Sequence, residues 1–556
     1  MGGEQVAVAT DRQPAFSGQP NVADVVSVAD LIERDHLLAN QAAVHARTHE
    51  TAAMRMNDAA YERACADDAD RRKANSHACL EGDSAGRHNG DERGGERADR
   101  PEERIERPVV RLEEKKHHPE NQPRNNHPNC NNTPDGVVIA ALMDFDIPAD
   151  IQATLDGLDE FIEREIKPLE AENDNMRFFD HRREWARTDF ENGGVPRKDW
   201  EELLREMRRR ADAAGWLRLA LPEEYGGRSA SNLEMAIIRE HLATKGLGLH
   251  NDLQNESSIV GNFPTVLMMR DYGTREQKAE WMPGFFDGTK RLAFGLTEPN
   301  HGSDATYLET TAVRDGDEWV INGMKRFNSG LHHASHDIIF ARTSGEPGEP
   351  IGISAFLVPT DADGFSVDFF WWTFNMPTDH AEVSMKDVRV GPEAVFGRID
   401  HGLDLAQLFV HENRIRQAAS SLGAAQFCID EAVAYANGRV TWGKKLSANQ
   451  GIQFPLVELH TQAAMLRQLV RYTAWLMDQK HHMELTHLVA MCNYQANRLV
   501  CDAADRAMQT CGGIGYSRHM PFEHIYRHHR RYRITEGSEE IQMRKVAQNL
   551  FGFGRK

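Results

Sequence analysis

Long apolar runs are missing from this 556-residue sequence, and none reaches the ~20 residues that a membrane-spanning helix requires. The sequence also lacks Cys-x-x-Cys pairs, and its seven cysteines are an odd number. These features favour reduced thiols in a cytoplasmic setting over a disulfide framework. Positive charge is in deficit too, since the formal net charge is -20. A protein that binds a nucleic-acid backbone needs a basic face, so we expect no nucleic-acid partner.

Large apolar residues are sparse in residues 1–142, and none persist at a helical spacing. Such a segment cannot bury enough surface to offset the entropy that its ordering would cost. We therefore expect this extension to be disordered. A second hypothesis is that Met143 is the native start and that the upstream residues are an artefact of gene assignment, because helical patterning begins abruptly there.

Amphipathic helices are indicated from Met143 onward. Apolar residues recur at steps of three and four, the spacing that places them on one face of a helix. The first such set is Ile151, Leu155, Leu158, Ile162 and Ile166. Similar patterning continues to about Met269, so the sequence predicts an amino-terminal helical domain over residues 143–291.

The pattern changes to short β-strands over residues 292–397, which we expect to form a middle β domain. Trp319-Val320-Ile321 is followed by Asn322-Gly323, a dipeptide that favours a two-residue hairpin turn. Residues 338–341 and 353–358 are apolar runs closed by turn residues, as is typical of strands.

Helical spacing returns in residues 398–556, which we expect to form a carboxy-terminal domain similar to a four-helix bundle. One apolar stripe steps alternately by four and three residues, as expected for one face of a long helix. Its members are Leu459, Ala463, Leu466, Val470, Thr473 and Met477. The predicted fold class is therefore α+β, in the order helical domain, β domain, helical domain.

Three polar, glycine-containing segments are candidates for a ligand site. Residues 294–304 and 322–330 combine hydroxyl groups, glycines and exposed backbone at strand ends, which suits a planar heterocycle with several hydrogen-bonding edges. Residues 509–516 hold a glycine cluster that lets a pyrophosphate approach backbone N–H groups. The alternative is that all three segments are ordinary polar turns.

Five motifs occur in one order along the chain. They are Thr-Glu-Pro-x-x-Gly-Ser-Asp from Thr297, Asn-Gly-x-Lys from Asn322, Arg-x-Thr-Trp-Gly-Lys from Arg439, Gln-x-x-Gly-Gly-x-Gly-Tyr from Gln509 and Glu-Gly-Ser from Glu536. With these motifs the sequence resembles the acyl-CoA dehydrogenase family over residues 143–550. A single motif would be weak evidence, but five in order on a helix–β–helix background are specific.

The resemblance implies that FAD is the cofactor and that two groups of residues bind it. The first group lies along the flavin ring and the pyrophosphate, and it matches Phe294, Leu296, Thr297, Ser303, Phe327 and Ser329. The family more often has Trp and Thr at the last two positions, and Asn328 replaces a usual apolar residue. The second group belongs to a neighbouring subunit in the family, and it matches Arg439, Thr441, Trp442, Gln509 and Gly513. The resemblance therefore implies a homo-oligomer, either a dimer or a tetramer.

The resemblance also implies that Glu536 is the catalytic base, which removes the α-proton of an acyl-CoA thioester. Some relatives place the base on an earlier helix, at the position of Asn413, and an asparagine cannot serve. Glu539 and Glu540 follow closely and are rival candidates. Arg414 matches an arginine that helps to hold the CoA moiety. A carboxylate in an apolar pocket has a raised pKa, which suits this task.

The activity that the resemblance implies is α,β-dehydrogenation to a trans-2-enoyl-CoA, in fatty acid and lipid metabolism, with electrons passed to an electron-transfer flavoprotein. We expect a homotetramer in a bacterial cytoplasm rather than a mitochondrion. An oxidase, a monooxygenase, a desulfinase or a non-catalytic assembly protein on the same fold remain alternatives. His332, His333 and His336 lie close together but match no zinc pattern, so we expect no metal. The sequence does not define acyl chain length or branching.

Overall fold

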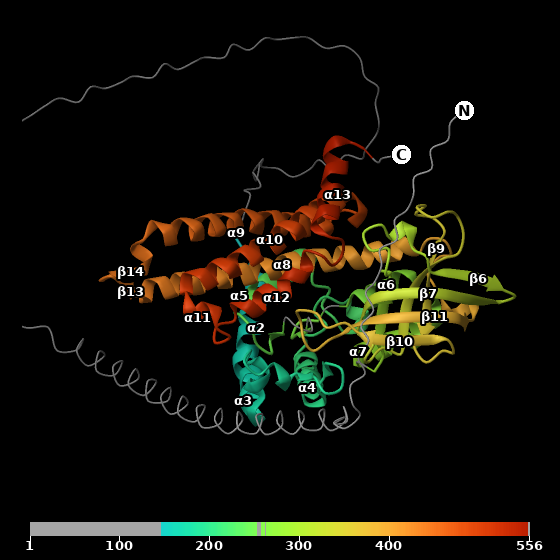
Figure 1. Ribbon diagram of the computed structural model, residues 1–556, viewed down its shortest axis with the longest axis horizontal. Coiled ribbons are helices and arrows are strands. Elements are labelled where there is room, and N and C mark those ends of the chain that lie inside the picture. The colour runs from blue at the N-terminus through green and yellow to red at the C-terminus, as the bar shows by residue number, and fades with distance from the viewer. Residues whose placement is uncertain (1–145, 253–256, 262, 288, 554–556) are drawn as a thin grey trace, which may run out of the picture. The chain divides into compact units, whose positions relative to one another are not determined.

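The computed structural model (Figure 1) describes residues 146–252, 257–261, 263–287 and 289–553. The extension over residues 1–142, with its expected disorder and the hypothesis of a start at Met143, lies outside the described residues. The described chain forms helices, then a β-sheet, then long helices, as Figure 1 shows in its progression from cyan through yellow to red.

Short helices build the amino-terminal part. Its α-helices are α2 (Ala149–Phe161), α3 (Lys167–Ala171), α4 (Lys198–Ala213), α5 (Asn232–Thr244), α6 (Pro264–Tyr272) and α7 (Arg275–Asp287). A π-helical turn, η1 (Ile162–Ile166), joins α2 to α3. The predicted apolar stripe from Ile151 to Ile166 is confirmed, because all five side chains are buried in one core with residues of α4 and α5.

The middle domain is an eight-stranded sheet. Its strands are β5 (Leu292–Gly295), β6 (Thr311–Asp315), β7 (Glu318–Ser329), β8 (His336–Arg342), β9 (Ile353–Pro359), β10 (Phe365–Phe370), β11 (His380–Val390) and β12 (Val395–Phe396). The order is β10-β11-β7-β6-β8-β9-β12, with β5 parallel to β8. The strands predicted at residues 338–341 and 353–358 are confirmed as β8 and β9. The remaining strands form two-stranded pairs elsewhere: β1 (Thr188–Asp189), β2 (Val195–Pro196), β3 (Asn251–Asp252), β4 (Ser257–Ser258), β13 (Val440–Thr441) and β14 (Lys444–Lys445).

The hairpin predicted at Asn322-Gly323 is wrong. β7 runs straight through both residues, and the β6–β7 turn lies earlier, between the paired residues Asp315 and Glu318. Gly323 instead permits a close approach, because an added Cβ would lie 2.4 Å from the Thr310 hydroxyl oxygen. The side chain of Asn322 accepts a hydrogen bond from the Asp387 N–H (2.8 Å), at an irregular point in the β7–β11 pairing.

Long helices form the carboxy-terminal part. They are α8 (Gly402–Gly438), α9 (Gln450–Met477), α10 (Thr486–Cys511), α11 (Gly513–Tyr516), α12 (Phe522–Tyr532) and α13 (Glu539–Phe551). Helix α8 packs against α10, α9 and α5 around one shared apolar core. The predicted stripe on α9 is confirmed from Leu459 to Thr473, where these side chains are buried, and Met477 is partly buried against the same core.

Two contacts between distant segments fix this arrangement. The carboxylate of Asp478, just after α9, accepts hydrogen bonds from the backbone N–H groups of Asn232 (2.8 Å) and Leu233 (3.2 Å), so it caps α5. The guanidinium of Arg527 on α12 reaches both the Glu184 carboxylate (3.0 Å) and the Phe374 carbonyl (2.8 Å). Arg527 therefore ties together the amino-terminal, β and carboxy-terminal parts.

Candidate active site

Two of the β-domain motifs lie side by side. The Arg326 N–H on β7 donates to the Thr297 carbonyl just after β5 (2.8 Å). The ammonium of Lys325 lies 2.8 Å from the Glu298 carboxylate, and both side chains are almost fully buried. Burial raises the pKa of Glu298, but the charge of Lys325 and hydrogen bonds outweigh it, so the pKa lies below its usual range. This buried ion pair holds the Thr-Glu-Pro segment against the Asn-Gly-x-Lys segment.

The side chains predicted to face a flavin are accessible around this junction. Ser303 and Ser329 are exposed, and the Phe327 side chain is 45% exposed. Phe327 has a positive φ of 64°, which a phenylalanine seldom adopts, and its ring contacts Trp371. Thr297 and Leu296 are partly buried. Hydroxyl groups, backbone and an aromatic face at the ends of two adjacent strands fit a flat, polar-edged ring such as a flavin.

Helix α8 brings this junction close to the predicted base. The ring of Phe409 stacks on the ring of Phe294, with centroids 4.2 Å apart and planes 9° apart. Five residues later, Arg414 donates from Nε (3.0 Å) and Nη2 (2.6 Å) to the backbone carbonyl of Glu536. Five residues of an α-helix rise about 7.5 Å, so the candidate flavin strand and Glu536 are attached to neighbouring turns of one helix.

Glu536 lies in a tightly held turn between α12 and α13. Its φ is 53° and that of Gly537 is 87°, so two consecutive residues are left-handed. Such a conformation costs a non-glycine residue about 1–3 kcal/mol and persists only where surrounding contacts fix it. Arg414 binds the carbonyl of Glu536, and the Gln542 amide donates to the carbonyl of Gly537 (2.8 Å). The Glu536 carboxylate atom Oε2 is buried and has no hydrogen-bond partner among the described residues.

The rival carboxylates are placed differently. Glu539 accepts two hydrogen bonds from Arg533 (both 2.9 Å) and one from Arg498 (3.0 Å). These hydrogen bonds, chiefly from Arg533, lower the pKa of Glu539 to about 2, so it cannot serve as a base near neutrality. Glu540 is exposed on the first turn of α13. At the other rival position, the side-chain oxygen of Asn413 accepts a hydrogen bond from Arg416 (2.9 Å).

Arg414 is buried, and it is engaged with the base-bearing turn. Burial lowers its pKa to about 10, which still leaves it cationic at neutral pH. One guanidinium nitrogen, Nη1, has no hydrogen-bond partner among the described residues. The predicted contact with CoA stays a prediction.

The second group of predicted cofactor residues lies far from the first within this chain. Arg439, Thr441 and Trp442 follow α8 at the end remote from the β domain, where β13 and β14 are drawn in Figure 1. The 37 residues of α8 span about 55 Å. Helix α10 runs alongside in the same direction, because Asn493 contacts Arg414 and Asn497 contacts Ser421. Gln509 and Gly513 therefore reach the same remote end. One chain does not bring the two groups together.

Comparison with known proteins decides the family. Profiles of the acyl-CoA dehydrogenase N-terminal, middle and C-terminal domains match residues 178–289, 293–388 and 400–551. The chain belongs to the acyl-CoA dehydrogenase family. The predicted family and three-domain fold are confirmed, and the chain is an oxidoreductase of a flavoprotein family whose general cofactor is FAD.

Several relatives match this chain over most of their own length. The acyl-CoA dehydrogenase FadE12 of Mycobacterium tuberculosis is 32% identical over 64% of this chain and 90% of its own. A subunit of the caffeyl-CoA reductase–Etf complex of Acetobacterium woodii is 30% identical over 65% of this chain and 91% of its own. Among solved structures, butyryl-CoA dehydrogenase from Megasphaera elsdenii matches with a TM-score of 0.59 at 26% identity, covering 74% of this chain and 100% of that one.

Some contacts of this candidate site could not be predicted from the sequence. Phe409 belongs to no motif, and only its stacking on Phe294 reveals its place. The Arg533–Glu539 pair spans six residues across a turn, so no helical spacing rule could have found it. Asn493 and Asn497 are fully buried polar residues on α10, and their repeat of four is ordinary for any helix.

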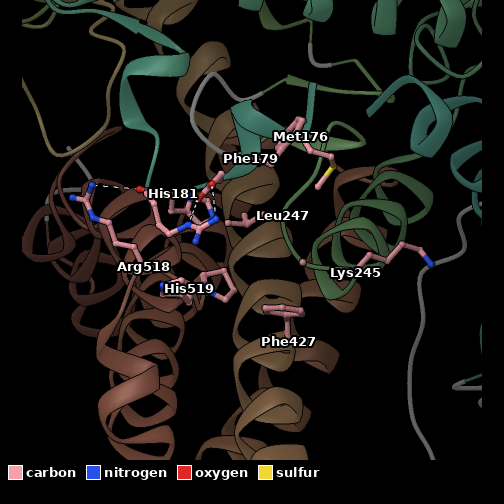
Figure 2. Close-up of a pocket in the computed structure, with 12 residues that line it drawn as sticks. Met176, Phe179, His181, Lys245, Leu247, Phe427, Arg518 and His519 are labelled. Atoms are coloured by element: carbon pink, nitrogen blue, oxygen red, sulfur yellow. Dashed lines mark hydrogen bonds and ion pairs between the residues drawn. The ribbon is translucent and has the colours of Figure 1, made fainter. Parts of the chain in front are cut away.

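A further cavity of about 340 Å³ lies away from this site (Figure 2). It is lined by segments around His181, Leu247 and Phe427 and by the loop that carries Arg518 and His519. Its cations have partners already, since Arg518 pairs with Glu184 (3.1 Å), and Lys245 pairs with Asp159 (2.8 Å). None of the sequence-predicted site residues lines it.

Metal-binding clusters and membrane helices are both absent from the described residues. No group of three or more His, Cys, Asp or Glu side chains within them is placed to hold a metal ion. The ring of His332 instead hydrogen-bonds to the Thr378 carbonyl (2.5 Å) and stacks on Phe370. No helix in the part of the chain that the structure describes is long and apolar enough to cross a membrane.

Proposed function

We propose that this protein is an FAD-dependent dehydrogenase that converts an acyl-CoA thioester to a trans-2-enoyl-CoA. The observation that carries the proposal is the buried, unpartnered carboxylate oxygen of Glu536, held in a strained turn by Arg414. A base needs a lone pair that no other group occupies, at a fixed position. The neighbouring Glu539 lacks this freedom because two arginines hold it.

In the proposed reaction, Glu536 takes the α-proton of the thioester on its free carboxylate oxygen. Arg414 fixes the Glu536 backbone, so the carboxylate does not have to be positioned anew in each turnover. The N–H of Glu536 is proposed to donate to the thioester oxygen and to stabilise the charge that develops there. A bound FAD would supply the acceptor for the hydride that leaves the β-carbon.

The FAD site is proposed to combine two subunits. Phe294, Leu296, Thr297, Ser303, Phe327 and Ser329 of one subunit would hold the flavin and part of the pyrophosphate. Arg439, Thr441, Trp442, Gln509 and Gly513 of a neighbouring subunit would hold the rest. The exposure of the remote end supports this proposal, because Trp442 is 98% exposed and Tyr516 is 87% exposed. We propose a homodimer as the minimal unit and a homotetramer as the assembly.

An electron-transfer flavoprotein is the proposed electron acceptor. A relative belongs to a caffeyl-CoA reductase–Etf complex by name, which supports a partner of this kind. The same name indicates that relatives can work in the reductive direction, so reduction of an enoyl-CoA is a second candidate activity. We propose a cytoplasmic role in fatty acid metabolism, with Arg414 contacting the CoA moiety.

A panel of acyl-CoA thioesters tests the proposal directly. The purified full-length protein should be yellow, and anaerobic addition of its thioester substrate should bleach the flavin absorbance. Saturated, branched and aryl-substituted thioesters in the panel would define the acyl group. If no saturated thioester reduces the bound flavin, the dehydrogenase proposal fails. Reoxidation by enoyl-CoA of a chemically reduced sample would then favour the reductase.

Different activities on the same fold would give different results when the same panel is also tested in air. An oxidase would consume dioxygen at a rate close to that of flavin reduction. A monooxygenase or a desulfinase would give a product other than the enoyl thioester. A non-catalytic assembly protein would show no bleaching with any thioester.

A further inference from the structure

A buried polar pair lies directly beneath the candidate flavin strand. Asn328 on β7 and Asp337 on β8 are both completely buried, and the Asn328 amide donates to the Asp337 carboxyl atom Oδ2. Asn328 thus gives the buried Asp337 a hydrogen-bond donor.

The pair supports β5 at one residue. An added Cβ at Gly295 would lie 2.6 Å from the Asn328 amide nitrogen, 2.8 Å from the Ile339 side chain and 3.2 Å from Asp337 Oδ1. The amide and carboxyl groups therefore press against the backbone of Gly295. Gly295 lies between Phe294 on β5 and Leu296 just after it, and both are proposed flavin contacts. A shift of the pair would move both contacts.

The charge on Asp337 is poorly compensated. The cation whose charge acts on Asp337 is Lys325 on β7. Its ammonium group is buried and forms an ion pair with the Glu298 carboxylate (2.8 Å). The second carboxyl oxygen of Asp337, Oδ1, has no hydrogen-bond partner among the described residues. Its neighbours on β5 and β9 are Ala293 and Val358, which are apolar. Burial raises the pKa of Asp337 to about 7, against the opposing effects of Asn328, Lys325 and the backbone N–H of Ile338.

We propose that Asn328 and Asp337 are a positioning pair for the cofactor, and that FAD binds tightly only when Asp337 is protonated. This inference rests on the proposed FAD site. FAD carries two negatively charged phosphates, and an ionised Asp337 would place a further negative charge in the buried, low-dielectric layer next to residues proposed to hold it. Protonation removes that charge and gives Asp337 a donor, for which the unpartnered Asn328 side-chain oxygen is an available acceptor.

FAD affinity of the apoprotein between pH 6 and pH 8, measured by quenching of flavin fluorescence, tests the inference. For the wild-type protein, the dissociation constant should rise as the pH passes through about 7, by at most about tenfold per pH unit. Asp337→Asn should keep the low-pH affinity throughout that range. Asn328→Leu should weaken FAD binding at every pH, because it removes the amide that lies against Gly295 and holds the carboxyl group of Asp337 in place.

Two further variants separate positioning from general damage to the sheet. The exchanged pair, Asn328→Asp with Asp337→Asn, keeps one amide–carboxyl hydrogen bond and should restore affinity relative to Asn328→Leu. Ser354→Ala is the matched control, because Ser354 is also fully buried in this sheet and accepts a hydrogen bond from the Asp400 N–H (2.7 Å). It should leave both the affinity and its pH profile unchanged.

Each outcome bears on one claim. An unchanged pH profile in Asp337→Asn, or wild-type affinity in Asn328→Leu, would overturn the inference while the FAD proposal stands. If the apoprotein binds no FAD at any pH, the proposed function fails instead. Should Asp337→Asn not fold, the exchanged pair decides alone: failure to improve on Asn328→Leu would overturn the inference. Melting temperatures of the apoproteins provide a readout that does not involve the cofactor.

Discussion

Glu536 is held through its backbone and not through its carboxylate. Arg414 and Gln542 bind the carbonyls of Glu536 and Gly537, and Oε2 of Glu536 is left buried without a partner among the described residues. Three residues later, Glu539 shows the opposite arrangement, with its carboxylate fixed by Arg533 and Arg498. The two carboxylates are therefore held differently, and the distinction depends on contacts that join α8, α10 and the turn before α13.

Arg414→Lys tests how Glu536 is positioned. Lysine has one nitrogen where arginine donates from two, so the Glu536 carbonyl should be held less firmly. We expect flavin reduction by the acyl-CoA to slow on the order of a hundredfold, since small misplacements of a catalytic group have effects of this size. Rapid-mixing absorbance measurements would give the rate.

Arg467→Lys is the control for that variant, because Arg467 is a partly buried arginine that also donates to a glutamate, here to the carboxylate of Glu240, and it lies on helix α9 away from the turn. Its rate of flavin reduction should match the wild-type rate. Equal rates in Arg414→Lys and the wild-type protein would show that Arg414 has no positioning role.

At the scale of elements, α8 is the structural link between the candidate flavin strand and the candidate base. Its Phe409 stacks on β5, and its Arg414 binds the turn before α13. Helix α5 packs against α8. The Asp478 carboxylate, just after α9, caps the first turn of α5. The helices that frame the site are thus tied by contacts between residues more than 240 positions apart in sequence.

Asp478→Ala should destabilise the protein by about 1 kcal/mol, the usual effect of removing a side chain that accepts hydrogen bonds at a helix amino terminus. Its carboxylate also interacts favourably with the helix dipole of α5. Differential scanning calorimetry would show the lowered melting temperature. Glu458→Ala, at an exposed position on α9, should leave the melting temperature unchanged. A melting temperature as high as that of the wild type in Asp478→Ala would refute the capping role.

The sequence predicted the elements better than their connections. The apolar stripes of α2 and α9 and the strands β8 and β9 were predictable because their periodicity is local. The Asn322-Gly323 hairpin was wrong because Gly323 serves a close approach to Thr310, which lies just before β6. Likewise, the sequence offered Glu536, Glu539 and Glu540 as carboxylates. Their partners distinguish the first two: Arg414 binds the backbone of Glu536, whereas Arg498 and Arg533 bind the carboxylate of Glu539.

At the scale of the whole molecule, several histidines are shielded from solvent: His250 lies inside the amino-terminal part, and His181, His524 and His528 lie where α12 meets the amino-terminal and β parts. Burial lowers the pKa of His181 and His250 to about 4, and it lowers the pKa of His524 and His528 well below the usual value. The unfolded chain then binds more protons than the folded chain between pH 6.5 and about 4. These groups therefore contribute stability above pH 6.5 that is lost as the pH falls.

We expect the melting temperature to drop steadily between pH 6.5 and pH 4.5, in urea-free buffer of constant ionic strength. Asp337 has the opposite sign, because its raised pKa favours the folded state at low pH, so Asp337→Asn should steepen the drop. A melting temperature that is constant or rises over this interval would contradict the assignment of neutral buried histidines.

Complementation tests whether the cofactor site is shared between subunits. One variant combines Thr297→Ala with Ser329→Ala in the β-domain group, and the other is Arg439→Glu in the remote group. Each alone should retain little FAD. When both are co-expressed, half of the dimers should be mixed and each should have one intact site, so about a quarter of the sites should hold FAD. No recovery of FAD in the mixture would indicate that each chain builds its site alone.

The central claim is that Glu536 is the base of an acyl-CoA dehydrogenase. Its most direct test is anaerobic reduction of the bound flavin by the best acyl-CoA substrate, compared between the wild-type protein and Glu536→Gln. The account predicts that Glu536→Gln retains FAD. Its rate of flavin reduction should be lower by at least about a hundredfold, because the amide cannot accept the α-proton. A Glu536→Gln variant that bleaches as fast as the wild-type protein would contradict the account.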